Sequence, residues 1–211
     1  MFSTAIGAGV VWLLWRRGLP FPPVNSSVID KTLLFAVAAC LIGVGIAFGL
    51  AKVEGAPWRP PKPGSLGAPV ALVMIVQLLG AAAEEVGWRG VVQPLLETRL
   101  APLQAALITG VLFGLGHFYL AFAIAPASFA LFVVSAIAIS MILAVATFGR
   151  TLGARIVIAT FLHYLLNMAT LSLFSDGDGS VLYFADLAAA FGVCGAIAWV
   201  PLIRHRGMVT I

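Results

Sequence analysis

Five ionisable side chains stand well inside long apolar stretches of the sequence, where a charge is expensive to keep. They are Glu84, Glu85, Arg89, His117 and His163. A charged side chain at the centre of a bilayer costs at least about 2.5 to 3.5 kcal/mol on insertion scales. Such residues persist when they face a protected cavity and serve a site, so we treat these five as candidate functional residues.

The first cluster carries two adjacent carboxylates that should face different ways. Glu85 and Arg89 are four residues apart, so on a helix they share a face and can form an ion pair. We interpret that pair as a supporting one that fixes the helix. Glu84 points about 100° away from Glu85, so its carboxylate is not needed for this ion pair and is available for another role.

Two further helices are predicted to present polar groups on one face. Phe113 and His117 are four residues apart, and so are His163 and Asn167. Small residues near His117 would let neighbouring helices approach closely. These small residues are Gly110, Gly114 and Gly116. The pattern suits a single polar pocket in the core of a helix bundle, with Phe113 among its supporting residues.

Hydrolysis of a peptide bond is the chemistry that this set of residues suits, because it needs an activated water and a stabilised oxyanion. Glu84 is the best candidate for the general base, since a carboxylate in an apolar setting holds a proton more tightly than one in water. His117 could hold the same water or pass the proton to the leaving amine. His163 and Asn167 could donate hydrogen bonds to the oxyanion, each worth about 2.7 to 4 kcal/mol of barrier.

A metal is the alternative way to activate the water. Glu84, His117 and His163 could supply three ligands to zinc and leave a fourth position for water. However, the sequence has no HExxH motif, and an oxyanion role for His163 competes with ligation. We therefore favour a water activated by glutamate without a cofactor, and keep zinc open.

The composition predicts that these residues are carried by helices in a lipid membrane. Of the 211 residues, 62% are hydrophobic and 9% are charged, and the mean hydropathy is +1.09. An ordinary soluble domain carries about 25% charged residues. The net charge of +4 does not indicate nucleic acid, because the basic residues sit at the ends of apolar runs, where they meet anionic lipid headgroups.

Apolar runs along the chain predict an all-α bundle of about seven transmembrane helices, with six to eight as the range. Most runs are near the length that crosses a hydrocarbon core about 30 Å thick, and none alternates as a barrel strand would. The first run is short and could be interfacial. The runs are Met1–Trp15, Thr32–Ala51, Ala68–Leu96, Pro102–Phe122, Ser128–Phe148, Ile156–Phe174 and Val181–Ile203. We divide this single membrane domain into N-terminal helices and a loop (1–67), a catalytic core (68–174), and a last helix with a basic tail (175–211).

Basic residues in the loops predict a cytoplasmic C-terminus and an external N-terminus. The supporting residues are Arg16, Arg17, Lys31, Arg150, Arg155, Arg204 and Arg206. The loop that holds Lys52, Arg59 and Lys62 disagrees, since it would face outward.

Depth along the predicted helices raises a conflict. Glu84 would lie roughly 24 Å below the start of its helix, close to the cytoplasmic side. His117 would lie roughly 22 Å up from Pro102, and His163 roughly 10 Å up from Ile156. These levels meet only if the third helix extends to about Leu96 or the fourth starts below the bilayer plane. A bend between Pro94 and Pro102 would permit either arrangement.

Three motifs together resemble a known family. Glu84-Glu85-Val86-Gly87-Trp88-Arg89 reads EExxxR, Phe113-Gly114-Leu115-Gly116-His117 reads FxxxH, and His163-Tyr164-Leu165-Leu166-Asn167 reads HxxxN. In this order they resemble the CPBP (ABI) family of intramembrane proteases, which includes type II CAAX prenyl endopeptidases and bacterial proteins linked to bacteriocin processing or self-immunity. The resemblance covers about half the chain, from roughly Ala68 to Phe174.

The resemblance implies an intramembrane endopeptidase in which both glutamates and both histidines are functional. Its substrate would be a membrane-associated peptide or protein, either with a prenylated CAAX-like C-terminus or with a leader peptide. The expected location is the bacterial cell membrane. The family name also invokes a metalloprotease, which keeps the zinc alternative in view.

Two other classes remain open on the residues alone. A non-catalytic membrane module, such as an immunity protein, would keep the pocket but work by binding. A proton-coupled transporter also uses buried carboxylates and histidines, but it usually shows repeated halves. Here the polar positions cluster in one central stretch, with no counterpart before Ala68.

Overall fold

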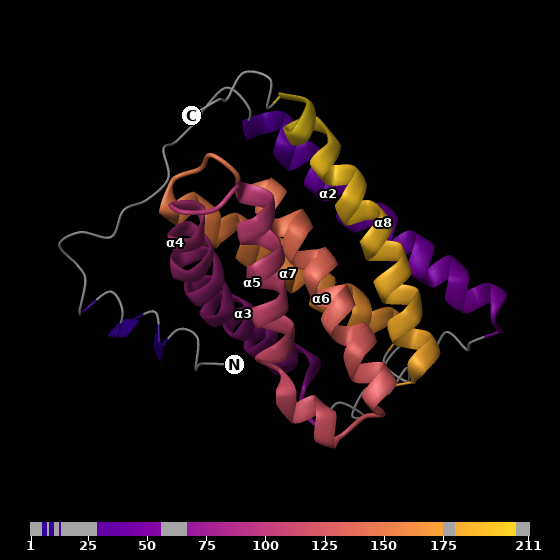
Figure 1. Cartoon of the computed structure of the whole chain (residues 1–211). Coiled ribbons are helices and arrows are strands. Elements are labelled where there is room, and N and C mark those ends of the chain that lie inside the picture. Colours follow the sequence, from indigo (N-terminus) through magenta and orange to yellow (C-terminus); the bar gives the residue numbers. More distant parts are fainter. Residues whose placement is uncertain are drawn as a thin grey trace.

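The computed structural model describes residues 29–55, 67–174 and 180–205, with positions 6, 7, 9, 10 and 13 near the N-terminus. Within these residues every regular element is a helix, and the helices form a bundle, which confirms the predicted all-α class (Figure 1). Most of the Met1–Trp15 run lies outside the described residues, as do the loops 56–66 and 175–179.

Five stretches of the described chain are long and apolar enough to cross a membrane, which agrees with five of the predicted runs. A shorter apolar helix accompanies them. The elements are α2 (Ile29–Val53), α3 (Val70–Gly87), the π-helix η2 (Trp88–Val92), α4 (Gln93–Glu97), α5 (Pro102–Leu115), the 3₁₀-helix η3 (Phe118–Phe122), α6 (Pro126–Thr147), α7 (Leu152–Phe174) and α8 (Val181–His205).

The fourth predicted run does not form one spanning helix. α5 has 14 residues, and at about 1.5 Å per residue it is roughly 21 Å long, short of a hydrocarbon core about 30 Å thick. After Leu115 the chain turns at Gly116 and His117, and η3 begins at Phe118. The prediction of a helix from Pro102 to Phe122 was therefore wrong, because apolar composition does not report where a helix ends.

α3 continues through η2 into α4 as one apolar stretch from Val70 to Glu97, which confirms the longer third helix. Pro94 has no backbone N–H, and its ring would clash with the carbonyl four residues earlier in a regular α-helix. The wider turn avoids this clash: the N–H of Gln93 donates to the carbonyl of Trp88, five residues back. The chain reverses only after Glu97, and Pro102 then occupies the first turn of α5.

The bundle core is built largely from small side chains. α6 packs against α2, α5, α7 and α8, while α3 packs against α7, and Figure 1 shows α2 and α8 side by side. In lipid there is little hydrophobic gain from burying a leucine rather than exposing it, so close packing of small residues drives helix association. Many large side chains accordingly point outward, as with Leu41, which is 69% exposed, and Phe122, which is 85% exposed, although a few such as Phe191 are fully buried.

Glycines let α5 approach α6 closely, as the sequence predicted. A Cβ on Gly110 would lie 2.7 Å from the Cα of Ile137, and one on Gly114 would lie 3.1 Å from the Cα of Val133. The obstacle at both positions includes backbone, which cannot rotate away as a side chain can.

Gly110→Ala is expected to lower the stability of the bundle by about 1 to 3 kcal/mol, the usual cost of overpacking. The melting temperature of the detergent-purified protein would measure it. Gly45→Ala is the matched control, because nothing lies within 4 Å of its added Cβ. Equal melting temperatures for the two variants would contradict the close contact between α5 and α6.

Candidate active site

Glu84, His117 and His163 lie at similar depths in the bundle. Depth is measured here from the end of the bundle at which α4 ends and α7 begins. Arg155, near the start of α7, pairs with Glu97 at the end of α4, with 2.7 Å between Nη2 and Oε2. From this common end, Glu84 lies about 20 Å along its helix, His117 about 22 Å, and His163 about 17 Å. The conflict in the sequence therefore disappears, because α3–α4 is continuous and α7 begins at Leu152.

Glu84 lies between two imidazole rings that come from other parts of the chain. Its Oε1 is 3.9 Å from Nε2 of His117, and its Oε2 is 3.9 Å from Nε2 of His163. Both distances exceed a direct hydrogen bond. The Glu84 side chain is 13% exposed whereas that of Glu85 is 0% exposed, so a small molecule can reach Glu84 but not Glu85.

Each ring is held at its Nδ1 atom by an oxygen acceptor. Nδ1 of His163 lies 2.8 Å from Oε1 of Glu85, and Nδ1 of His117 lies 2.9 Å from the carbonyl oxygen of Phe113. A carbonyl or a carboxylate only accepts, so the hydrogen-bond network assigns the proton to Nδ1 in both rings. In a neutral ring, Nε2 then carries a lone pair, and it is Nε2 that faces Glu84 in both cases.

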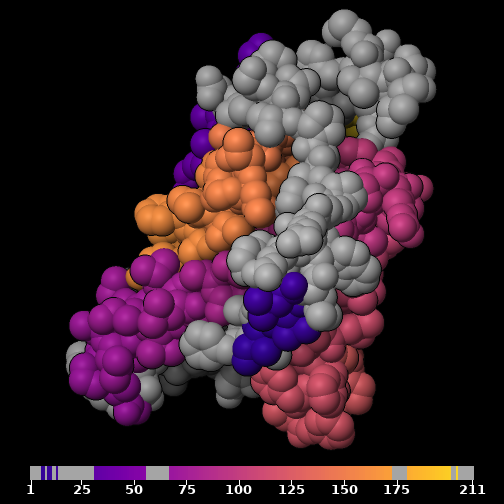
Figure 2. Space-filling model, turned by 90° about the vertical axis from the view of Figure 1, so that its left-hand side faces the viewer, coloured from indigo at the N-terminus to yellow at the C-terminus, as the bar shows by residue number. Residues whose placement is uncertain are grey.

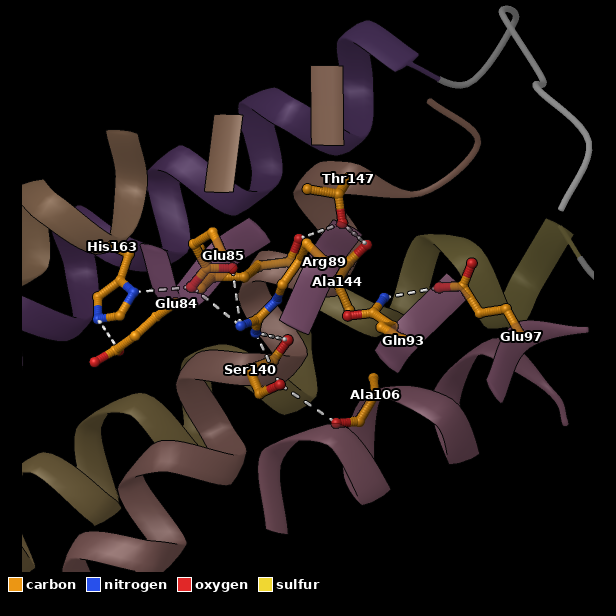
Figure 3. Close-up of polar contacts among 11 residues, drawn as sticks. Glu84, Glu85, Arg89, Gln93, Glu97, Ala106, Ser140, Ala144, Thr147 and His163 are labelled. Carbon is orange, nitrogen blue, oxygen red and sulfur yellow. Dashed lines mark hydrogen bonds and ion pairs between the residues drawn. The ribbon is translucent and has the colours of Figure 1, made fainter. Parts of the chain in front are cut away.

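The predicted pair between Glu85 and Arg89 is present and fully buried. Nη1 of Arg89 lies 3.0 Å from Oε2 of Glu85 and donates to its Oε1 at 3.1 Å. Nη2 of Arg89 donates to the hydroxyl of Ser140 at 2.9 Å, and that hydroxyl donates to the carbonyl of Ala106 at 3.4 Å. Figure 3 shows this chain of contacts, which links α3 and η2 to α5, α6 and α7.

Sequence reasoning missed two of these partners. Ser140 is one of several serines in an apolar run, and nothing in its spacing marks it. The contact between Glu85 and His163 joins residues 78 positions apart, so no helical periodicity could reveal it. The sequence offered only one signal for this contact: Glu85 and His163 are both costly to bury without a hydrogen-bond partner.

Aromatic rings pack around the two histidines. The Phe113 ring lies 5.0 Å from that of His117 and 5.7 Å from that of His163, measured between centroids. Trp88 packs edge-on against Phe113 at 5.8 Å, and Phe132 packs edge-on against His117 at 5.4 Å. Phe113 therefore contacts both rings; its contact with His117 agrees with the spacing of four residues, whereas its contact with His163 was not predicted.

Asn167 lies one helical turn beyond His163 on α7. Its Nδ2 donates to Oε1 of Gln77 on α3, at 3.3 Å. The structure thus brings Glu84, His117 and His163 together, and it places Asn167 on the adjoining turn with a partner that the sequence did not single out.

The donor types at Glu84, His117 and His163 are ones that zinc accepts, but their spacing is wide. Zinc binds such atoms at about 2.0 to 2.2 Å, which sets tetrahedral ligand atoms about 3.4 Å apart. Here each ring Nε2 lies 3.9 Å from a Glu84 oxygen. Among the described residues, no group of three or more His, Cys, Asp or Glu side chains is arranged to hold a metal ion. The residues do not fit zinc in this arrangement.

Comparison with known proteins agrees with the class that fold and site define, a polytopic helical membrane protein with a cluster of polar side chains inside the bundle. Residues 66–169, about half of the chain, match the family model described as Type II CAAX prenyl endopeptidase Rce1-like. These residues therefore belong to the Rce1-like family of type II CAAX prenyl endopeptidases, which confirms the resemblance. The family indicates a protease, and together with the apolar helices it indicates an integral membrane protein. No curated protein matches the chain.

Breaking the buried ion pair is expected to destabilise the protein strongly. Arg89→Met leaves the Glu85 carboxylate uncompensated, which costs about 3 to 5 kcal/mol when one partner of a buried pair is removed. The double variant Glu85→Gln with Arg89→Met should recover part of this loss, because no buried charge remains. Melting temperatures of Arg89→Met, of Glu85→Gln and of the double variant give the coupling energy between the two side chains. Strictly additive losses would contradict the pairing.

Proposed function

We propose that the protein is an intramembrane endopeptidase that hydrolyses a peptide bond of a membrane-associated peptide or protein. One observation carries the proposal. The accessible carboxylate of Glu84 is faced by the Nε2 atoms of two histidines, and the Nδ1 atom of each is already committed to another acceptor. An accessible carboxylate thus lies between two imidazole Nε2 atoms, each of which accepts a hydrogen bond in the neutral ring and donates one in the protonated ring, inside a chain whose family is proteolytic.

Glu84 and His117 are suited to activate a water together. A water that donates one proton to Oε1 of Glu84 and the other to Nε2 of His117 spans a gap such as the 3.9 Å between these atoms. Its oxygen lone pair is then directed at the substrate carbonyl. Glu84 takes the proton as the water attacks, and Glu84 or His117 returns a proton to the leaving amine.

The two histidines differ in their Nδ1 partners, and this supports different roles. His117 donates to a backbone carbonyl, which suits a neutral ring that accepts from water. His163 donates to a carboxylate, and such an acceptor bonds a charged ring more strongly. A protonated His163 would carry a hydrogen on Nε2 and could donate it to the oxyanion, with Asn167 as the second donor.

We infer the class of substrate from the family rather than from the geometry of the site. A CAAX-like C-terminus, prenylated or not, is the first candidate, and a leader peptide of a membrane-bound precursor is the second. Aromatic rings beside the two histidines, such as Phe113 and Phe132, are compatible with apolar substrate groups. We propose a bacterial cell membrane as the location. The basic residues in the loops support a cytoplasmic C-terminus.

Glu84→Gln is expected to lower peptide hydrolysis by about 10²- to 10⁴-fold, the usual contribution of a general base. The detergent-purified protein would be assayed with a library of quenched fluorescent peptides that includes prenylated CAAX-type members. Glu54→Gln is the matched control, because Glu54 is exposed just after the end of α2.

A strong chelator added to the same assay should leave the rate unchanged if the water is activated without a metal. Loss of activity in chelator, restored by zinc, would contradict the metal-free mechanism. If the native protein hydrolyses no member of the library, or if Glu84→Gln is fully active, the pocket works by binding or by transport rather than by proteolysis.

A further inference from the structure

Gln77 is a polar side chain in an otherwise apolar half of α3. The preceding residues of the helix, from Val70 to Val76, are all apolar, and its neighbours Val76 and Leu78 are exposed at 47% and 39%. An amide in lipid is costly unless it is hydrogen-bonded. Gln77 lies seven residues before Glu84, so the two share one face of the helix after two turns. That face is turned to α7, because Gln77 contacts Asn167 and Glu84 approaches His163. α3 packs against α7, and the two helices lie next to each other in Figure 2.

Two polar contacts join these helices at neighbouring levels. At the level of the candidate site, His163 donates to Glu85. On the adjoining turn of α7, Asn167 donates to Gln77. A pair of carboxamide side chains, one from each helix, therefore lies next to the candidate site along α7.

We propose that Gln77 is a positioning residue that fixes which edge of the Asn167 amide faces the reacting carbonyl. This rests on the proposed peptidase function. The side-chain amide of asparagine can turn either its oxygen or its nitrogen to a ligand, and only the nitrogen can donate to an oxyanion. The acceptor oxygen of Gln77 lies 3.3 Å from Asn167 Nδ2 and takes one of its two hydrogens. The second hydrogen of that nitrogen is left for the oxyanion.

The role can be separated from packing by two substitutions of similar size. Gln77→Met keeps the length of the side chain but lacks an acceptor amide oxygen, whereas Gln77→Glu keeps an oxygen that accepts. We expect Gln77→Met to lower kcat about tenfold with KM changed less than about twofold, because a donor that acts in the transition state is misaligned. Gln77→Glu should retain most of the activity.

Gln104→Met is the matched control, because Gln104 is an exposed glutamine that accepts from the backbone N–H of Ala101 at the start of α5. It should leave kcat and KM as they are. Wild-type kcat in Gln77→Met would overturn the proposal. So would an equal loss in Gln77→Glu and Gln77→Met, which would mark Gln77 as a packing residue.

A second measurement does not depend on catalysis. The sequence contains two asparagines, Asn25 and Asn167, so protein labelled with ¹⁵N-asparagine gives two side-chain amide signals, and an Asn25→Ser background leaves that of Asn167. In Gln77→Met the Asn167 amide protons should shift upfield and exchange faster with water, while Gln77→Glu preserves them. Unchanged signals in Gln77→Met would overturn the inference. If the Asn167 signals change in Gln77→Met but the native protein hydrolyses no peptide, the contact between Gln77 and Asn167 is confirmed. The peptidase function, and with it the role of Gln77 in that function, is then wrong.

Discussion

The rest of the site depends on one buried ion pair, Glu85 with Arg89. Neither side chain is accessible, so each charge needs partners inside the bundle. Arg89 reaches Ser140 on α6, and Glu85 reaches His163 on α7. The pair thereby joins the elements that carry the site. The Glu85 side chain is fully buried in this pair, so the neighbouring Glu84 is the carboxylate that a substrate or water can reach.

A local irregularity in one helix sets the level at which the groups meet. Pro94 would break a regular helix, but the π-turn between Trp88 and Val92 carries the chain past it. Gly90 in that turn lets Ile156 of α7 approach, because a Cβ added at Gly90 would lie only 3.1 Å from the Cδ1 of Ile156. π-turns are often found at functional sites, and here the turn begins three residues after Glu85 and contains Arg89. Continuity of α3 with α4 brings Glu84 level with His117 and His163.

Composition and the lengths of the apolar runs were enough to predict the helical class. Local spacing was enough to predict the pairing of Glu85 with Arg89 and the separate orientation of Glu84, because both follow from helical geometry within a few residues. It was not enough to place the end of α5, since the residues after Leu115 are as apolar as those before. Nor could it find Ser140 or Gln77, whose partners lie 51 and 90 positions away. Contacts between helices depend on the packing of the whole bundle, and a single sequence carries no direct record of it.

The proposed hydrolysis requires the substrate carbonyl to lie between Glu84 and His163. Cryo-electron microscopy of the Glu84→Gln variant with a bound substrate peptide tests this directly. We predict that the scissile carbonyl carbon faces residue 84 and His117, with the carbonyl oxygen about 3 Å from Nε2 of His163. A peptide bound elsewhere on the bundle, or a scissile carbonyl turned away from His163, would contradict it.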